Sequence, residues 1–450
     1  MNETERRHCR IGSLQSHFSA YGSERAWNNT YYEGLIWPAD YPYNDNSVIK
    51  RSWIAVRDFT DAEDYHWDYW ATYMSMGYVK LSLYPVKLKQ TAKFAAPTVF
   101  VDGNNITAPY AGDVDAINPN QIPDRIIENV VNTSIGLTMI RRVHAFSQQY
   151  HDNYFIKEFV FTNTGFINYD SVVVLTDTLK GVRIGWGTRY QCGREVGYST
   201  DGQQTWGMHS WVTVRGEEYP EHYSDQLTES TPIEELHNGP IRCSFEWFGQ
   251  SERRTYDCIG GPYLTRDGRL TAIQHVGTAI LHVDKSINDR SDDPYQPAVL
   301  GWHAGDSYQS VGELTHSEMI NMGKVYTYLS GEPSGGDKNG GSIHSGNGRM
   351  DEIYEGEITD RVDPYTVHGD GGGTNVWICY GPFDIPLGDS IKIVEVEAVD
   401  GISRTMCEQI GRRWKQAYDN PSDTGPFDLP DGTTTSDKNF YKNSWVYTGK

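Results

Sequence analysis

The sequence predicts a mainly β protein, built as a large antiparallel β-sandwich of the super-sandwich kind. Glycine and proline account for 45 and 20 of the 450 residues, a density of turn formers that does not suit long helices. Aromatic residues reach 13 %, with 30 tyrosines, and aromatic side chains are favoured in strands. Runs of alternating, β-branched and aromatic residues follow one another at the short spacing expected of a sandwich.

We expect three regions along the chain. Residues 1–120 predict an irregular, aromatic-rich N-terminal region with strands at 52–59, 78–88 and 98–103. Residues 121–402 predict the sandwich domain, which opens with a short helix at 123–131 because a proline near the start suits helix entry. Its strands are expected at 134–147, 153–165, 171–179, 181–190, 207–216, 241–249, 270–283 and 388–399.

The third region, residues 403–450, predicts one helix and a tail. Met406, Ile410 and Trp414 recur four apart on one stripe, and Ser403 is placed to cap the helix N-terminus. We expect this helix, at 403–418, to pack against a sheet. Residues 419–439 show no apolar periodicity and predict a loop or linker.

Net charge excludes one class of protein and the lack of long apolar runs excludes another. Sixty acidic residues against 39 basic ones give a net charge of −21, and such a chain repels nucleic-acid phosphates. No apolar run approaches the ~18 residues of a membrane-spanning helix, so we expect neither a nucleic-acid partner nor a membrane span.

Cysteine usage and the N-terminus bear on the compartment. None of the six cysteines forms a C-x-x-C pair; Cys243 and Cys258 bracket a segment that a disulfide could close as a hairpin, and the alternative is that both are buried thiols. The first residues, MNETERRHCRIG, have no apolar signal-peptide core, which fits a cytoplasmic protein, a mature chain or a chain without its leader. The acidic, aromatic-rich and turn-rich composition favours the exported alternatives.

Three long segments resemble a family. They are SQQYHDNYFIKEFVFTNTG at 147–165, LHVDKSINDRSDDPYQP at 281–297 and YGPFDIPLGDSIKIVEVEAVDGISR at 380–404. The chain is similar to uncharacterised large secreted proteins of bacteria related to the Bacteroidetes and Marinimicrobia. Relatives of this kind carry a signal peptide, fibronectin-type modules and a type IX secretion sorting domain. The resemblance implies export and an extracellular or cell-surface location, implies no reaction, and leads us to expect a fragment or a trimmed chain.

The best candidate catalytic pair is Glu395 and Glu397. Residues two apart in a strand share a face and lie ~6.5–7 Å apart, close to the ~6.5–9.5 Å between the acid and base of inverting glycosidases. Ile391, Ile393 and Val399 share that face, so burial would raise a carboxyl pKa. The alternative is a pair of solvated acids, or of acids paired with arginine.

A second catalytic candidate is Tyr150 with His151, directly before a predicted strand. Tyrosine or histidine beside a sheet can abstract a proton, as in polysaccharide lyases. The same segment equally suits turn formation, because neighbouring aspartate and asparagine side chains satisfy loop backbone groups.

Acidic loops supply the candidate cofactor, Ca²⁺. Calcium takes six to eight oxygen ligands, and extracellular calcium supports weak sites, although no segment here has the spacing of an EF-hand. Solvated acidic turns are the competing explanation. The candidate ligands lie in one loop: Asp284, Asn288, Asp289, Asp292 and Asp293.

Exposed aromatic side chains can stack on sugars or form protein interfaces. Trp27, Trp37, Trp67 and Trp70 are the candidate ligand-binding aromatics, and use in the core is the alternative. Nucleophile elbows, zinc-protease motifs and phosphate loops do not occur. The sequence therefore favours a secreted or cell-surface structural or binding protein that contacts polysaccharide or associates with itself. The alternative is a glycoside hydrolase or polysaccharide lyase on a β-sandwich.

Overall fold

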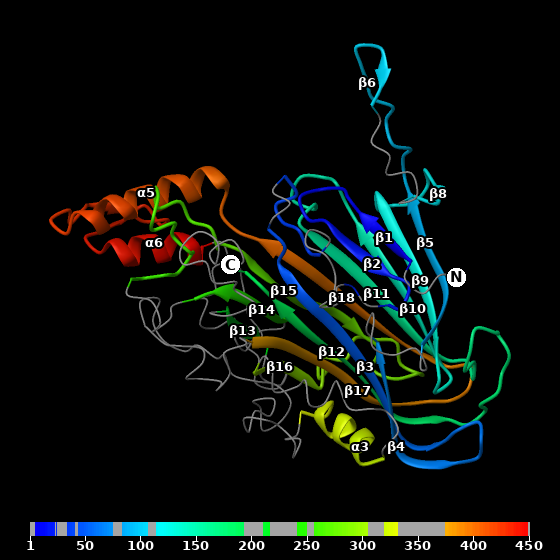
Figure 1. Cartoon of the computed structure of the whole chain (residues 1–450). Coiled ribbons are helices and arrows are strands. Elements are labelled where there is room, and N and C mark those ends of the chain that lie inside the picture. The colour runs from blue at the N-terminus through cyan, green and yellow to red at the C-terminus, as the bar shows by residue number, and fades with distance from the viewer. Residues whose placement is uncertain are drawn as a thin grey trace.

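The computed structural model describes residues 5–22, 24, 34–40, 44–74, 83–106, 114–192, 210–216, 241–249, 256–304, 319–331 and 374–448. In this part of the chain two large sheets face each other, and nearly all their strands pair antiparallel (Figure 1). The prediction of a mainly β, sandwich-like protein is confirmed.

The larger sheet has nine strands. In spatial order they are β13 (Ser210–Arg215), β14 (Arg242–Phe248), β15 (His275–Val283), β18 (Ser390–Asp400), β11 (Tyr154–Asn163), β10 (Leu137–Ala145), β9 (Arg125–Thr133), β5 (Leu83–Ala92) and β8 (Ala116–Ile117). The smaller sheet has five, namely β16 (Val299–Ala304), β17 (Thr374–Ile385), β12 (Leu179–Tyr190), β3 (Ser47–Thr60) and β4 (His66–Met74).

Short elements complete the described structure. Three two-stranded units pair β1 (Arg6–Cys9) with β2 (Ser16–Ser19), β6 (Phe100–Val101) with β7 (Asn104–Asn105), and β19 (Phe427–Asp428) with β20 (Thr434–Thr435). The described helices are α3 (Met319–Tyr328), α5 (Arg404–Asp419) and α6 (Lys438–Tyr447). Among the described residues, none of the helices has the length and apolar character that crossing a bilayer requires.

The core lies between the two sheets because their inner faces are apolar. Along β11 and β18 buried and half-buried residues alternate strictly, so each strand turns one face inward. Phe159 of β11 packs against Trp186 of β12 at 4.9 Å between ring centroids, which joins the larger sheet to the smaller one. Trp186 also contacts Tyr380 of β17 in an edge-to-face arrangement.

Two sequence predictions are wrong in this region. The expected helix at 123–131 is strand β9, in which Ile127, Asn129 and Val131 point inward with the two-residue period of a strand. Its β-branched residues pack between β10 and β5, and this context outweighs the proline signal. The expected strand at 171–179 is irregular, with Val172, Val173 and Val174 exposed, and β12 begins only at Leu179.

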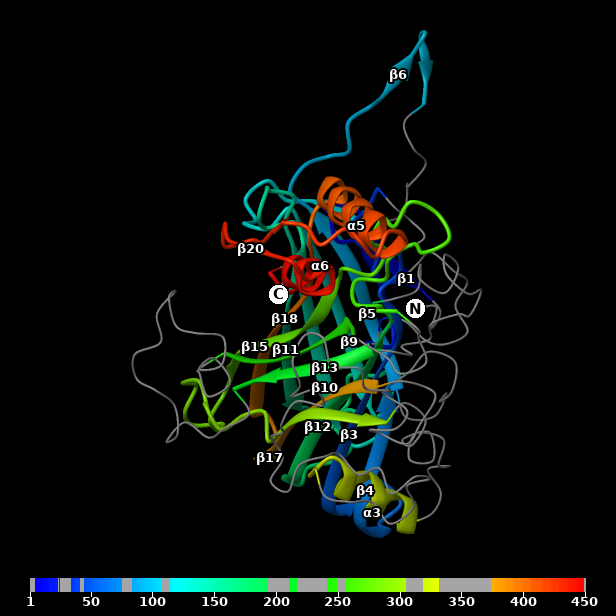
Figure 2. The same cartoon turned by 90° about the vertical axis from the view of Figure 1, so that its left-hand side faces the viewer.

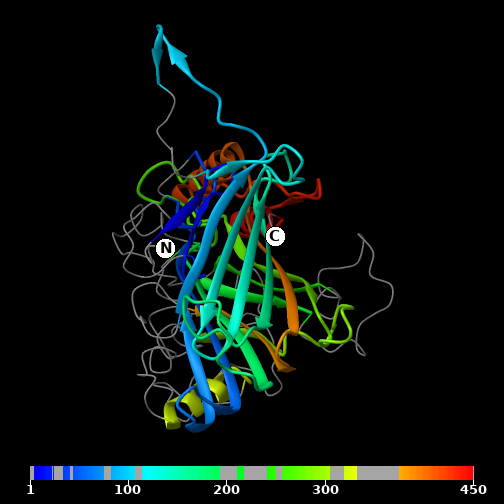
Figure 3. The same cartoon turned by 90° about the vertical axis from the view of Figure 1, so that its right-hand side faces the viewer.

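The N-terminal region shares the sheets of the sandwich domain. β3 pairs with β12, and β5 pairs with β9, so strands from residues 1–120 form one edge of each sheet, with β5 and β8 in the larger sheet and β3 and β4 in the smaller one (Figure 3). Residues 1–120 and 121–402 therefore pair with each other in both sheets. The expected strand at 78–88 begins at Leu83 in the described residues and extends to Ala92.

The C-terminal region is more ordered than its sequence predicts. Ser403 caps α5 as expected, its side chain accepting from the N–H of Met406 at 3.3 Å. α5 packs beside α6, not on a sheet face (Figure 2). The indole of Trp414 in α5 donates to Asn439 of α6 at 2.9 Å. The predicted linker at 419–439 contains β19, β20 and the start of α6, which is capped by Asp437.

Candidate functional site

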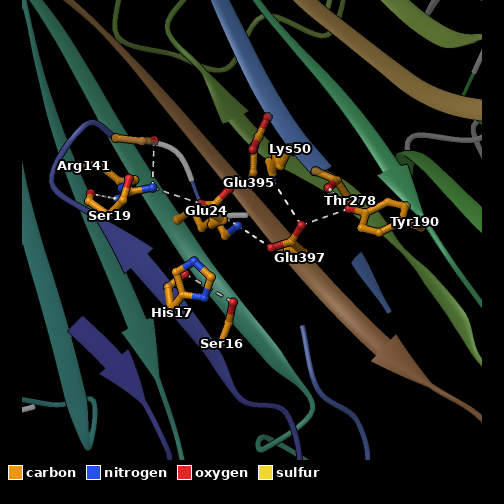
Figure 4. A network of polar contacts seen from close by, with 12 residues as sticks. Ser16, His17, Ser19, Glu24, Lys50, Arg141, Tyr190, Thr278, Glu395 and Glu397 are labelled. Atoms are coloured by element: carbon orange, nitrogen blue, oxygen red, sulfur yellow. Dashed lines mark hydrogen bonds and ion pairs between the residues drawn. The ribbon is translucent and has the colours of Figure 1, made fainter. Parts of the chain in front are cut away.

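A network of buried charged residues lies between the two sheets (Figure 4). The larger sheet contributes Arg141 of β10, Lys157 of β11 and Glu397 of β18, and the smaller sheet contributes Lys50 of β3. Glu24, which follows β2, is the fifth member. The inward face of each strand places these side chains in the core, where a charge is stable only if it is paired.

Every charge in this network has an opposite partner. Glu397 accepts from Lys50 at 3.2 Å and is also paired with Lys157. Glu24 accepts from Lys157 at 3.1 Å and from Arg141 at 3.0 Å. The pair of Lys50 with Glu397 joins the smaller sheet to the larger one, and Glu24 links Lys157 to Arg141 within the larger sheet.

The pairing determines the ionisation of the two carboxyl groups. Burial alone would raise the pKa of Glu397, but the ammonium groups of Lys157 and Lys50 outweigh it and lower that pKa. Burial likewise opposes ionisation of Glu24, yet Lys157, Lys50 and Arg141 together lower its pKa to about 2. The same carboxylates raise the pKa of Lys50 above its ordinary value, against the effect of burial.

Glu395 has the opposite character. It shares the inner face of β18 with Glu397, as predicted, and burial raises its pKa. The hydroxyl of Tyr380 donates to its Oε1 at 2.8 Å, while in the described part of the chain its Oε2 accepts no hydrogen bond. The prediction of a desolvated pair with a raised pKa thus holds for Glu395, whereas Glu397 is held ionised.

The network makes the free energy of unfolding depend on pH. Because the pKa of Glu24 is about 2 in the folded protein against about 4.5 unfolded, its contribution is complete above pH 4.5 and is lost as the pH falls towards 2. We expect a loss on the order of 3 kcal/mol over that interval. Urea unfolding at several pH values measures it. In Glu24→Gln the slope with pH should flatten, and an unchanged slope would contradict this role.

A cavity of about 310 Å³ opens at one end of strands β15 and β18. β15 and β18 are antiparallel, with His275 opposite Asp400, so residues 269–274 and 401–407 leave the sheet at the same end. Trp37, Pro38, Asp40 and Asn44, which precede β3 in the sequence, line the third side. From Glu397 to Gly401 is four residues of strand, about 13 Å, and neither Glu395 nor Glu397 lines this cavity.

The cavity has a buried floor and an exposed mouth. Trp37, Leu270, Ile273 and Cys407 supply apolar surface, and all four are buried. The polar lining residues are Asp40, Asn44, Arg269, Thr271, Gln274, Ser403 and Arg404, of which Asp40, Ser403 and Arg404 are exposed at the mouth.

Two buried amides line the cavity with unused acceptors. Asn44 donates to the carbonyl of Trp37 at 2.7 Å, while its Oδ1 accepts no hydrogen bond from the described residues. The Oε1 of Gln274 likewise has no donor in the described part of the chain. An unsatisfied buried acceptor costs about 1–3 kcal/mol, so a ligand hydroxyl that reaches either amide gains a favourable partner.

The second predicted catalytic pair lies in a turn. Tyr150 is 82 % exposed with φ of 69°, and the Nδ1 of His151 shares a hydrogen bond of 2.7 Å with the hydroxyl of Tyr154. Neither residue lines the cavity. The structure therefore separates this pair from both the network and the cavity.

The candidate calcium ligands face arginine and backbone donors. Asp284 pairs with Arg290 at 2.5 Å. Asp292 accepts two hydrogen bonds from Arg242, at 3.0 and 2.9 Å. Asp289 accepts from Ser291, and Asn288 and Asp293 lie in the same turns. Among the described residues no group of three or more His, Cys, Asp or Glu side chains is placed to hold a metal ion.

The four predicted tryptophans have different positions. Trp37 lines the cavity, and Trp67 and Trp70 of β4 are half-buried and pack on each other at 4.6 Å. Trp27 lies outside the described residues. The predicted bridge between Cys243 and Cys258 is corrected: the structure contains both as thiols, with the Sγ of Cys258 donating to the carbonyl of Gly249 at 3.2 Å.

Sequence reasoning missed most of both sites. Arg141 and Lys157 share the two-residue spacing of their strands' buried residues, but nothing local identifies their partners, and the lining residues of the cavity come from three distant segments. Comparison with known proteins adds no assignment: no family model matches the chain, and no curated protein matches it in sequence.

Proposed function

We propose that this is a secreted or cell-surface β-sandwich protein that binds polysaccharide through the cavity at the end of β15 and β18. One observation carries the proposal: Trp37 lies in the same cavity as the unused amide acceptors of Asn44 and Gln274. A sugar has an apolar ring face and a rim of hydroxyl groups, so an aromatic surface beside hydrogen-bond acceptors matches its chemistry.

The size of the cavity limits what enters. A volume of about 310 Å³ is at the small end of the ~300–1,000 Å³ typical of ligand sites. We therefore expect the cavity to hold the end of a sugar chain, with the remaining units outside the mouth formed by Asp40, Ser403 and Arg404.

Titration calorimetry with a panel of oligosaccharides tests the proposal. We expect at least one of them to bind, and to be displaced by longer chains with the same terminal sugar. A panel in which no oligosaccharide produces heat or raises the melting temperature would contradict the proposal.

The alternative, a carbohydrate-active enzyme, has one observation in its favour. Glu395 and Glu397 share a face, and their surroundings move their pKa values in opposite directions, as an acid and a base require. Both are buried away from the cavity, so a substrate would have to reach them by another route. Two measurements test this alternative. The wild type should hydrolyse a polysaccharide, and Glu395→Gln should lose that activity.

Self-association is supported by a projecting hairpin. β6 and β7 extend away from the sandwich (Figure 1), joined by Asp102 and Gly103, both with positive φ as a two-residue hairpin turn requires. Phe94, Phe100 and Ile106 are each more than half exposed on this arm. A two-stranded hairpin is marginally stable alone in water, so a second copy that covers the arm would stabilise it.

We expect the double variant Phe100→Ser/Val101→Ser to associate at least about tenfold more weakly than the wild type, since burial of such side chains contributes about 1.5–3 kcal/mol each. Sedimentation velocity over a range of concentrations measures this. Ile122→Ser is the matched control, because Ile122 is 82 % exposed elsewhere on the molecule. Association that is absent in the wild type, or equal in all three proteins, would contradict a role for the arm.

A further inference from the structure

The mouth of the cavity is locally positive in an acidic protein. Arg269 and Arg404 both line it, and Asp40 is the one acidic side chain among its described lining residues, although the chain as a whole carries a net charge of −21. Arginine presents five N–H donors in a planar fork that matches a carboxylate with two parallel hydrogen bonds. The cavity is thus a place where this protein attracts negative charge.

The N-terminus of α5 adds to this field. Ser403 and Arg404 open the 16-residue helix at the mouth, and its first turn contains no acidic side chain. A helix N-terminus carries a positive partial charge of roughly half a unit and stabilises anions nearby. The side chain of Ser403 accepts only from the N–H of Met406, which caps the helix without adding charge.

The buried amides are an independent observation that points to a ligand in the same place. Gln274 is 2 % exposed and Asn44 is 4 % exposed, and each has a side-chain oxygen without a donor among the described residues. A bare anion cannot satisfy an acceptor, because it has no hydrogen to donate. A ligand with both a carboxylate and hydroxyl groups can pair with the exposed Arg404 and donate to the amides at the same time.

Building on the proposed function, we propose that the cavity selects an acidic sugar: a terminal uronic acid whose carboxylate pairs with Arg404. Its hydroxyl groups donate to the amides of Asn44 and Gln274, and its ring face lies against Trp37. Arg404 is 77 % exposed and contacts Glu408 at 3.4 Å, so its outer N–H groups can turn towards a ligand.

Calorimetry with an oligosaccharide of glucuronate and the matching oligosaccharide of glucose tests the proposal. We expect the acidic sugar to bind at least about tenfold more tightly at low salt, with the difference shrinking as salt screens the charges. In Arg404→Gln the preference should fall to about threefold or less. Arg412→Gln is the matched control, since Arg412 lies on the same helix and also pairs with Glu408 but does not line the cavity.

The outcomes separate the two proposals. If neither oligosaccharide binds, nor any other in the panel, the proposed function itself fails. If the glucose and glucuronate forms bind equally well, the protein binds sugars and the acidic preference is wrong. If Arg404→Gln weakens the binding of both sugars by the same factor, the carboxylate does not pair with Arg404. The same conclusion follows if Arg412→Gln removes the preference for the acidic sugar as completely as Arg404→Gln does.

Discussion

Replacement of Lys157 by methionine is expected to lower the free energy of unfolding by about 3–5 kcal/mol, the cost of removing one partner from a buried ion pair. Lys157 is fully buried and pairs with both Glu24 and Glu397. Without it these two carboxylates keep Lys50 and Arg141 but lose the cation that lies between them. Urea unfolding followed by tryptophan fluorescence measures the effect.

The chain provides a matched control for this prediction. Lys392 of β18 pairs with Glu158 of β11 at 2.7 Å, so the same two strands carry an ion pair on their outer face. Lys392 is 42 % exposed there, and exposed pairs contribute about 0–1 kcal/mol. Lys392→Met should therefore cost less than about 1 kcal/mol. Equal costs for the two variants would show that the buried network does not hold the sheets together.

A double variant examines whether the cost arises from an unpaired charge. In Lys157→Met/Glu397→Leu one cation and one anion are removed together, so the net charge of the network is the same as in the wild type. We expect a smaller loss than the sum of the two single variants, with a coupling of about 1–3 kcal/mol. A double variant whose loss equals the sum would mean that Lys157 and Glu397 stabilise the protein independently.

The largest effect on binding is expected for Trp37→Leu, which should weaken oligosaccharide binding about tenfold, or about 1.4 kcal/mol. Leucine keeps apolar volume in the wall of the cavity but lacks the aromatic face on which a sugar ring stacks. Calorimetry on a variant whose thermal unfolding remains cooperative measures the change. Trp37→Phe should restore affinity to within about threefold of the wild type.

Trp67→Leu is the control for this variant. Trp67 is half-buried on β4, donates to Asp61 at 2.8 Å and does not line the cavity. We expect Trp67→Leu to lower the stability of the protein and to leave its affinity for the oligosaccharide unchanged. If Trp37→Leu binds as well as the wild type, or if Trp67→Leu loses as much affinity, the cavity is not where the sugar stacks.

The sequence predicted elements best where burial follows a strict two-residue period. The predicted bounds of β10, β11 and β18 lie within three residues of the observed ones, because burial alternates along the whole of β11, nearly all of β18 and from Met139 to Ala145 in β10. β9 was misread as a helix, since its consecutive β-branched residues and a preceding proline hide the alternation. α6 was missed because its start lies in a segment without apolar periodicity, where only Asp437 signals a cap.

The sites were harder to predict than the elements because long-range contacts create them. Lys157 and Glu397 are 240 residues apart in sequence, and only the pairing of β11 with β18 brings them together. For the same reason Trp37 was recognised as a candidate while its neighbours in the cavity were not. The face shared by Glu395 and Glu397 was predictable from two-residue spacing, whereas the lysines that hold Glu397 ionised were not.

The most direct test of the account is a crystal structure of the protein soaked with the oligosaccharide that binds most tightly in solution. The account predicts sugar density in the cavity, with a ring against Trp37 and hydroxyl groups at hydrogen-bond distance from Asn44 and Gln274. An ordered sugar bound elsewhere, with this cavity empty in the same crystal, would contradict it.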